Sequence, residues 1–175
     1  MELMNARGEH YGAIDQLVRQ AFSLSHYGYQ GEAELVKRIR VLADFDPMGE
    51  WIVSHEGQII AHGLLSPCKL VAAEQRIVGL VLAPLAVLPG FQGQGLGTRL
   101  ANKLIEQAAI AQQYPFISVL GQPSFYQRLG FVPASHYNIQ APFDVPEDYY
   151  LIYPLHSEVL ATQGGVIHYS SAFNL

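Results

Sequence analysis

The clearest candidate for chemistry in this sequence is a run of glycines and glutamines, Gln92-Gly93-Gln94-Gly95-Leu96-Gly97-Thr98. An apolar segment, Ile77–Val87, precedes the run, and an amphipathic segment that predicts a helix from about Gly95 to Gln112 follows it. Free N–H groups and the dipole at the start of a helix bind anions, and glycines let a phosphate approach the backbone. The order of strand, glycine loop and helix therefore predicts a phosphate-binding loop.

Two common nucleotide-binding motifs differ from this loop. A Walker loop needs a lysine after its last glycine, whereas Gly95 is followed by Leu96. The dinucleotide fingerprint Gly-x-Gly-x-x-Gly needs a glycine where Thr98 stands. These departures argue against a nucleotide-binding α/β module, which remains an alternative together with an ordinary glycine-rich turn.

Two segments together resemble a known family. Residues 85–98 closely resemble the acetyl-CoA motif of the GNAT superfamily of N-acetyltransferases, and Phe125–Phe131 resembles a second element of that family. The stretches Val119–Pro123 and Gly165–Tyr169, with Phe173, are similar to the YhbS-like branch. The resemblance covers the second half of the chain by its motifs and the first half only by the order of helices and strands.

The resemblance implies where acetyl-CoA binds. In the family the strand before the loop splays from its neighbour and pantetheine lies in the gap, so the backbone at Leu85 and Val87 is expected to bond the pantetheine amides. The Leu85 N–H would also polarise the acetyl carbonyl. The loop N–H groups and Thr98 are expected to hold the pyrophosphate. The expected cofactor-binding residues are Leu85, Val87, Gln92, Gly93, Gln94, Gly95, Gly97 and Thr98.

The resemblance also implies a catalytic residue, Tyr126. Its position matches the family's tyrosine that faces the CoA sulfur, where a phenol can protonate the departing thiolate. The alternative is a tyrosine that only packs against Phe125 and Leu129 on a short helix over 123–129.

The base that deprotonates the amine is harder to place. Many members of the family carry a glutamate four residues before the Leu85 position, but Val81 stands there, and no acid lies between Arg76 and Thr98. Either a water relay removes the proton or another segment supplies the base. The candidates are His26, Glu32, Glu50, His62 and Asp148. Cys68 is not expected to be a nucleophile, because no basic partner can be assigned to it.

Composition limits the class of protein. The 175 residues are 50% hydrophobic and 14% charged, which suits one domain over residues 1–175. The net charge of −5 and the lack of a Lys/Arg cluster argue against a nucleic-acid partner. A single cysteine favours a cytoplasmic setting without disulfide or metal site. No signal-peptide order or membrane span is expected, because the longest apolar run, Ile77–Leu88, is short and interrupted.

Hydrophobic periodicity predicts an α/β fold. Helices are predicted in 14–22, 32–42, 95–112 and 123–129, and strands in 51–55, 58–65, 68–72, 76–82 and 116–120. With the resemblance, these elements predict a single GNAT-like domain with a mixed, mostly antiparallel sheet of about six or seven strands and helices on both faces.

The expected function is transfer of an acetyl group from acetyl-CoA to an amine, directly and in a ternary complex. A non-catalytic CoA-binding regulatory domain is the alternative, since Val81 replaces the glutamate. The amine, a small molecule or a peptide, is not identified by the sequence, and a homodimer is left open.

Overall fold

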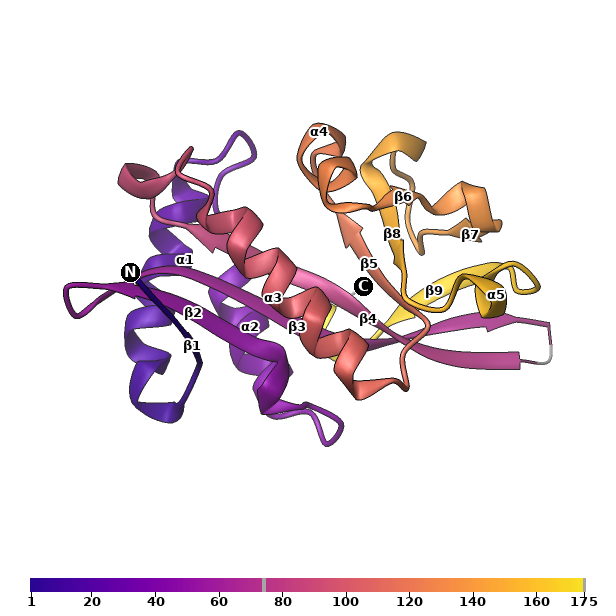
Figure 1. The fold of residues 1–175 in the computed structure, drawn as a ribbon, viewed down its shortest axis with the longest axis horizontal. Coiled ribbons are helices and arrows are strands. Elements are labelled where there is room, and N and C mark those ends of the chain that lie inside the picture. The colour runs from indigo at the N-terminus through magenta and orange to yellow at the C-terminus, as the bar shows by residue number, and fades with distance from the viewer. Residues whose placement is uncertain (74, 175) are drawn as a thin grey trace. The chain divides into compact units, whose positions relative to one another are not determined.

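The computed structural model describes residues 1–73 and 75–174, which form an α/β fold (Figure 1). The helices in these ranges are α1 (Tyr11–Ser23), α2 (Glu32–Arg40), α3 (Leu96–Ala111), α4 (Pro123–Tyr126) and α5 (Ser157–Leu160). The strands are β1 (Glu2–Asn5), β2 (Glu50–His55), β3 (Gln58–Ala72), β4 (Gln75–Val87), β5 (Phe116–Leu120), β6 (Val132–Pro133), β7 (Ile139–Gln140), β8 (Tyr150–Pro154) and β9 (Gly165–Tyr169). No helix in the described ranges is long and apolar enough to cross a membrane.

The strands form one sheet with the hydrogen-bonded order β1-β2-β3-β4-β5-β8-β6, while β9 pairs with β3 and β7. Only β4 with β5 and β7 with β9 are parallel among the pairings recorded for the described residues. The predicted fold class, a mixed and mostly antiparallel sheet with helices, is therefore confirmed.

Two details differ from the prediction. Residues 58–65 and 68–72 are not separate strands but parts of β3, which runs through Pro67. A proline removes one hydrogen-bond donor from a ladder, but it does not force the chain out of the extended region. The sheet has nine strands within the described ranges, more than the six or seven predicted. The additional strands include β1 and the two-residue strands β6 and β7, which are too short to show a clear periodicity in the sequence. In the predicted turn over 73–75, Glu74 lies outside the described residues.

The chain divides into two compact units, and β3 and β4 contribute to both. The first unit comprises residues 1–65 and 83–107, and the second comprises residues 66–82 and 108–175. Each unit is described by itself below.

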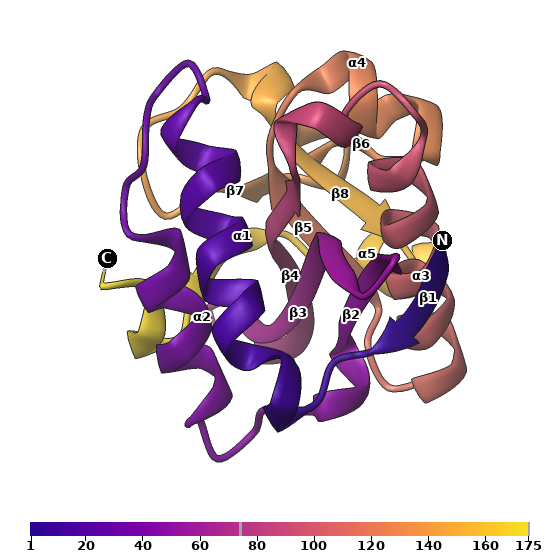
Figure 2. The same ribbon diagram turned by 90° about the vertical axis from the view of Figure 1, so that its left-hand side faces the viewer.

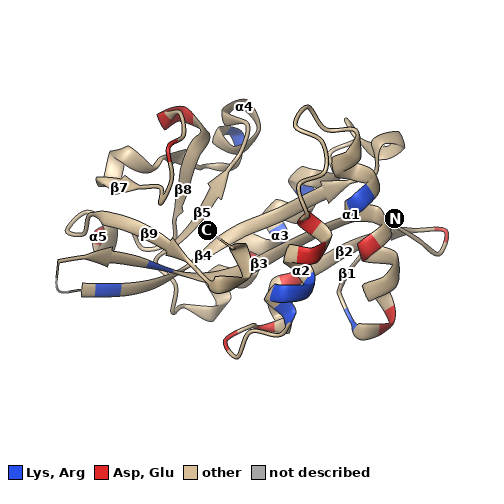
Figure 3. Cartoon of the chain, turned by 180° about the vertical axis from the view of Figure 1, so that it is seen from behind, with Lys and Arg blue, Asp and Glu red and all other residues tan. Residues whose placement is uncertain are grey.

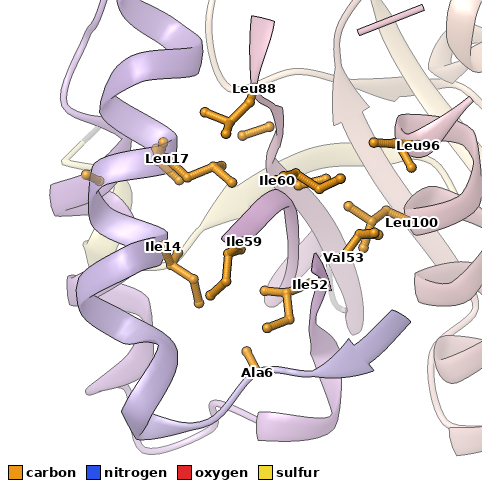
Figure 4. Packing of buried hydrophobic residues seen from close by; sticks show 14 residues of the cluster. Ala6, Ile14, Leu17, Ile52, Val53, Ile59, Ile60, Leu88, Leu96 and Leu100 are labelled. Atoms are coloured by element: carbon orange, nitrogen blue, oxygen red, sulfur yellow. The ribbon is translucent and has the colours of Figure 1, made fainter. Parts of the chain in front are cut away.

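In the first unit, helices cover both faces of the sheet (Figure 2). Helix α1 buries Ile14, Leu17 and Val18, and Figure 4 shows Ile14 and Leu17 pointing toward sheet residues such as Ile59. On the other side, Leu96 and Leu100 of α3 belong to the same apolar cluster as Val53. The 3.6-residue periodicity of α1 and α3 thus encodes their buried faces.

Charges on α2 are ordered along its axis (Figure 3). The first turn carries Glu32 and Glu34, and the last carries Lys37, Arg38 and Arg40. This arrangement complements the helix dipole, which is positive at the N-terminus and negative at the C-terminus.

In the second unit, β5 lies between β4 and β8 (Figure 1). Its antiparallel pairing with β8 covers all five of its residues, from Phe116↔Pro154 to Leu120↔Tyr150. Its recorded parallel pairing with β4 consists of Leu80↔Ile117 and Val81↔Ser118. Beyond Ser118, β5 therefore pairs in register only with β8 among the described residues.

Candidate active site

The glycine loop joins β4 to α3 in the first unit. After β4 ends at Val87, a 3-10 turn over Pro89–Phe91 leads into the loop, and α3 begins at Leu96. Gly93 and Gly95 have φ values of +74° and +79°, which residues other than glycine rarely adopt. A Cβ at either glycine would meet no heavy atom within 4 Å, so the loop leaves open space beside its backbone.

Backbone donors are available at the start of α3. The Arg99 N–H donates to the Gly95 carbonyl at 2.9 Å, which is the first α-helical bond recorded there. The N–H groups of the three preceding residues, Leu96 to Thr98, therefore have no acceptor within the helix. Gly95 and Thr98 are exposed. The arrangement can bind an anion such as a pyrophosphate.

Two hydrogen bonds tie Gln92 to the residues just before the loop. Its N–H donates to the Pro89 carbonyl at 3.3 Å, and its side-chain Nε2 donates to the Val87 carbonyl at 3.0 Å. Sequence reasoning did not identify this tie between the loop and the end of β4. The Val87 carbonyl has a second lone pair, so it can still accept another hydrogen bond.

Tyr126 ends the short helix α4 in the second unit. Its side chain is buried, and its ring lies 4.8 Å from the ring of Phe125 and 5.3 Å from that of Phe131. A Cβ at Gly121 would overlap the Tyr126 ring, so this glycine makes the close approach possible. Among the described residues the Tyr126 hydroxyl has no recorded hydrogen-bond partner. Burial raises the pKa of the phenol, which therefore stays protonated at neutral pH and can serve as a proton donor.

Sequence comparisons place the chain in a family. Residues 48–133 match the model of the acetyltransferase (GNAT) domain. The uncharacterized N-acetyltransferase YjhQ of Escherichia coli K12 is 31% identical over 124 residues, which cover 70% of this chain and 68% of the relative. The chain belongs to the GNAT family of N-acetyltransferases.

Further GNAT proteins match over most of the chain. The uncharacterized N-acetyltransferase YhbS of Escherichia coli K12 is 29% identical over 161 residues, covering 92% of this chain and 91% of that protein. A crystal structure of Escherichia coli YhbS in complex with CoA covers 99% of this chain and 92% of the other, with a TM-score of 0.86 at 24% identity. A GNAT acetyltransferase from Brucella melitensis in complex with acetyl-CoA covers 98% and 97%, with a TM-score of 0.77 at 24% identity.

Two candidate bases of this GNAT protein, Glu50 and His62, lie together in the first unit. His62 Nε2 is 2.8 Å from Glu50 Oε1, and Arg40 Nη2 lies 2.5 Å from the same oxygen. Burial would raise the pKa of Glu50, but hydrogen bonds from His62 and Arg40 outweigh it and hold this pKa below its ordinary value. A buried carboxylate held by a guanidinium is a poor proton acceptor, so the pair acts in structure rather than as a base.

The remaining candidate bases, Glu32, His26 and Asp148, are not buried. Glu32 Oε2 accepts from the Gln30 N–H at 2.8 Å, and His26 and Asp148 are exposed. Cys68 is buried, and burial raises the pKa of its thiol to about 12, so the reactive thiolate is absent at neutral pH.

Sequence reasoning missed a group of polar side chains in the second unit. Ser118 is fully buried, and its Oγ donates to the Leu80 carbonyl at 3.2 Å. The Tyr169 hydroxyl donates to the Tyr150 hydroxyl at 3.0 Å. The signal in the sequence was Ser118 itself, which is the one polar residue of the apolar strand Phe116–Leu120.

Proposed function

We propose that this GNAT protein transfers an acetyl group from acetyl-CoA to an amine by direct attack of the amine on the thioester. The observation that carries the proposal is the glycine loop, with open space beside Gly93 and Gly95 and N–H groups without helical acceptors at the start of α3. Family membership, and the relatives from Escherichia coli and Brucella melitensis solved with CoA and acetyl-CoA, support the same cofactor.

Each part of the cofactor has a proposed partner. The pyrophosphate binds the N–H groups of residues 93–98 and the Thr98 hydroxyl, while Gln92 acts through its side chain by fixing the loop to Val87. The pantetheine amides bond the backbone of Leu85 and Val87, and the Leu85 N–H polarises the acetyl carbonyl. Most of these contacts are main-chain, so side-chain identity matters mainly where bulk would exclude the cofactor.

The experiment that tests the proposal has two stages. A thermal-shift screen should show stabilisation by CoA and acetyl-CoA and none by ATP, because a ligand stabilises a protein whose folded state it binds. Release of free thiol from acetyl-CoA should then depend on an added amine in a panel of small amines and peptides. Binding of CoA without amine-dependent release would favour the non-catalytic CoA-binding domain, and stabilisation by ATP alone would favour the nucleotide-binding module.

Tyr126→Phe tests the proton donor. The variant keeps the ring that packs against Phe125 and Phe131 but removes the hydroxyl. If the phenol protonates the leaving thiolate, kcat should fall about tenfold to a hundredfold, the low end of acid catalysis, while acetyl-CoA affinity stays unchanged. Steady-state kinetics with the best amine, together with calorimetry, measures both quantities.

Tyr153→Phe is the matched control for Tyr126→Phe. The Tyr153 ring lies 5.4 Å from the ring of Phe131, so this tyrosine shares an aromatic neighbour with Tyr126 and has no assigned role in catalysis. Removal of the Tyr153 hydroxyl should leave kcat unchanged. Equal kcat values for wild type and Tyr126→Phe would remove Tyr126 from the mechanism.

The pH profile tests the proposed absence of a dedicated base. Without one, kcat/KM should keep rising with pH toward the pKa of the amine, because only the free amine attacks. Burial raises the pKa of Tyr126, so any fall in activity caused by ionisation of this phenol should occur only at more alkaline pH. Glu32→Ala and Asp148→Ala should each keep most of the turnover, as should Glu50→Gln and His62→Ala under conditions where they remain folded. A plateau set by a pKa of about 4 to 6 and abolished by one of these substitutions would reveal a base.

A further inference from the structure

The second unit contains a cavity of about 340 Å³, and none of the residues proposed to bind acetyl-CoA or to donate a proton lines it. Its lining residues all fall within 134–150, in the 3-10 turn Ala134–Tyr137, in β7, in the segment that leads into β8 and at the first residue of β8. The cavity therefore belongs to one compact unit. Its volume is at the lower end of the range for small-molecule sites.

The charged side chains that line the cavity, Asp144 and Glu147, are both acidic. Residues 134–150 contain no Lys or Arg, and Figure 3 shows Asp and Glu in the segment before β8. His136 is not part of the lining. No ion pair with either carboxylate is recorded among the described residues. The cavity therefore has negative charge without a recorded counter-ion and should attract a cation.

Ser135 fixes one of the two carboxylates, because its hydroxyl donates to Glu147 Oε1. Within the described ranges, no partner is recorded for Glu147 Oε2 or for the Asp144 carboxylate. Carboxylate oxygens only accept hydrogen bonds, and the Ser135 hydroxyl already has its proton engaged. This side of the cavity thus offers hydrogen-bond acceptors, which suit a primary ammonium with its three N–H donors.

The remaining lining is largely apolar and aromatic. Ile139 is buried, and the rings of Phe143 and Tyr150 lie 6.1 Å apart in an edge-to-face arrangement. Aromatic rings attract cations, and apolar side chains favour contact with a hydrocarbon chain. A metal ion suits the cavity less well, because no group of three or more His, Cys, Asp or Glu side chains in the described parts of the chain could hold one. The lining therefore fits a cation that is attached to a short alkyl chain.

We propose that this cavity binds a small primary alkylamine in its ammonium form. The ammonium group donates to the carboxylates of Asp144 and Glu147, and the alkyl chain packs against Ile139 and Phe143. The site goes beyond the proposed acetyl transfer, because binding there requires neither acetyl-CoA nor the glycine loop.

Titration with butylamine at pH 7 tests the site, since an alkylamine with a pKa of about 10 is almost entirely in the ammonium form at that pH. In two-dimensional ¹H–¹⁵N NMR spectra without acetyl-CoA, the amide signals of residues 134–150 should shift and saturate, with a Kd of about 1–10 mM for so small a ligand. The uncharged analogue 1-butanol should bind at least about tenfold more weakly. Raising NaCl from about 0.05 M to about 0.5 M should weaken butylamine binding, because salt screens exposed charges.

Two variants remove the charges and keep the size of the side chains. Asp144→Asn and Glu147→Gln should each raise the Kd for butylamine at least about threefold, and the double variant about tenfold, the upper range for exposed ion pairs. Glu147→Gln keeps an oxygen that can accept from Ser135. Asp148→Asn is the matched control, because Asp148 has the same charge in the same segment but does not line the cavity. Its Kd should equal that of wild type.

The outcomes separate a built site from diffuse attraction. Wild-type spectra without saturable shifts in 134–150 would overturn the site, and so would equal Kd values for wild type, Asp144→Asn and Glu147→Gln. An equal loss of affinity in Asp148→Asn would attribute binding to net charge alone and would overturn the site as well. This inference and the proposed function can fail separately, because the spectra are recorded without acetyl-CoA, whereas thiol release requires it.

Discussion

Replacing Gly95 with valine should weaken acetyl-CoA binding about a hundredfold or more. A valine side chain at this position would fill the open space where the pyrophosphate is proposed to approach the loop. The loss of two charge-assisted hydrogen bonds, at about 1.5 kcal/mol each, already corresponds to roughly that factor. Isothermal titration calorimetry of wild type and variant measures the change directly.

Backbone strain has to be separated from steric exclusion in this experiment. Gly95 has a φ of +79°, which a β-branched residue adopts only with strain. Gly57, in the turn between β2 and β3, has the same φ of +79° and also has no heavy atom within 4 Å of a Cβ. Gly57→Val therefore imposes a similar strain at a residue outside the 92–98 loop, and it should lower the melting temperature but keep acetyl-CoA affinity.

Gly95→Asn adds a second check, because asparagine tolerates positive φ while still adding bulk. It should lose affinity with little loss of stability. Wild-type affinity in both Gly95 variants would place the pyrophosphate elsewhere.

The glycine loop was predictable because its conformation and its proposed function both depend on the backbone. Positive φ at Gly93 and Gly95 favours glycine, and the buried face of α3 follows an amphipathic pattern, so both leave local signals in the sequence. Helices α1 and α2 and strand β5 were predictable for the same reason, because the pattern of apolar residues that defines each of them lies within a short stretch of sequence. The link from Gln92 to Val87 left no such signal, because nothing in the residue types indicates which carbonyl a glutamine side chain will reach.

The polar clusters were not predictable from sequence because they depend on strand register. Ser118 and Tyr150 meet only because β5 and β8 pair as Leu120↔Tyr150, and Tyr169 joins them through β9. Glu50 and His62 were named as separate candidates for a base, but pairing of β2 with β3 brings them together against Arg40 of α2. Their residue types suggested proton transfer, whereas their burial and partners indicate a structural ion pair.

Glu50→Ala should be the most destabilising of the substitutions considered. Glu50 is 1% exposed and the Arg40 side chain is 8% exposed, and the Arg40 guanidinium also lies 3.6 Å above the ring of Tyr11. Removing the carboxylate leaves this buried cation without its counter-charge and His62 Nε2 without its partner, which costs about 3–5 kcal/mol. Urea denaturation at pH 7 measures the difference in the free energy of unfolding.

A second variant shows whether the unpaired charge causes the loss. Replacing both members of the pair, as in Arg40→Met with Glu50→Leu, removes the buried cation and should recover part of the stability lost in Glu50→Ala. Glu34→Ala is the matched control for a lost carboxylate, because Glu34 pairs with Arg19 at a site where its side chain is 43% exposed. Solvent screens that pair, so the loss there should be much smaller.

The pH dependence provides the final check on Glu50. Its pKa is lower in the folded protein than the ordinary value of 4.5, mainly because hydrogen bonds from His62 and Arg40 overcome the effect of burial. A group with a lowered pKa in the folded state stabilises the protein above its unfolded pKa and loses that contribution as the pH falls through the folded pKa. The stability difference between wild type and Glu50→Ala should therefore be full above pH about 4.5 and shrink below it. A difference under about 1 kcal/mol at pH 7, or one that does not change in acid, would show that the Glu50–Arg40 pair does not stabilise the first unit in this way.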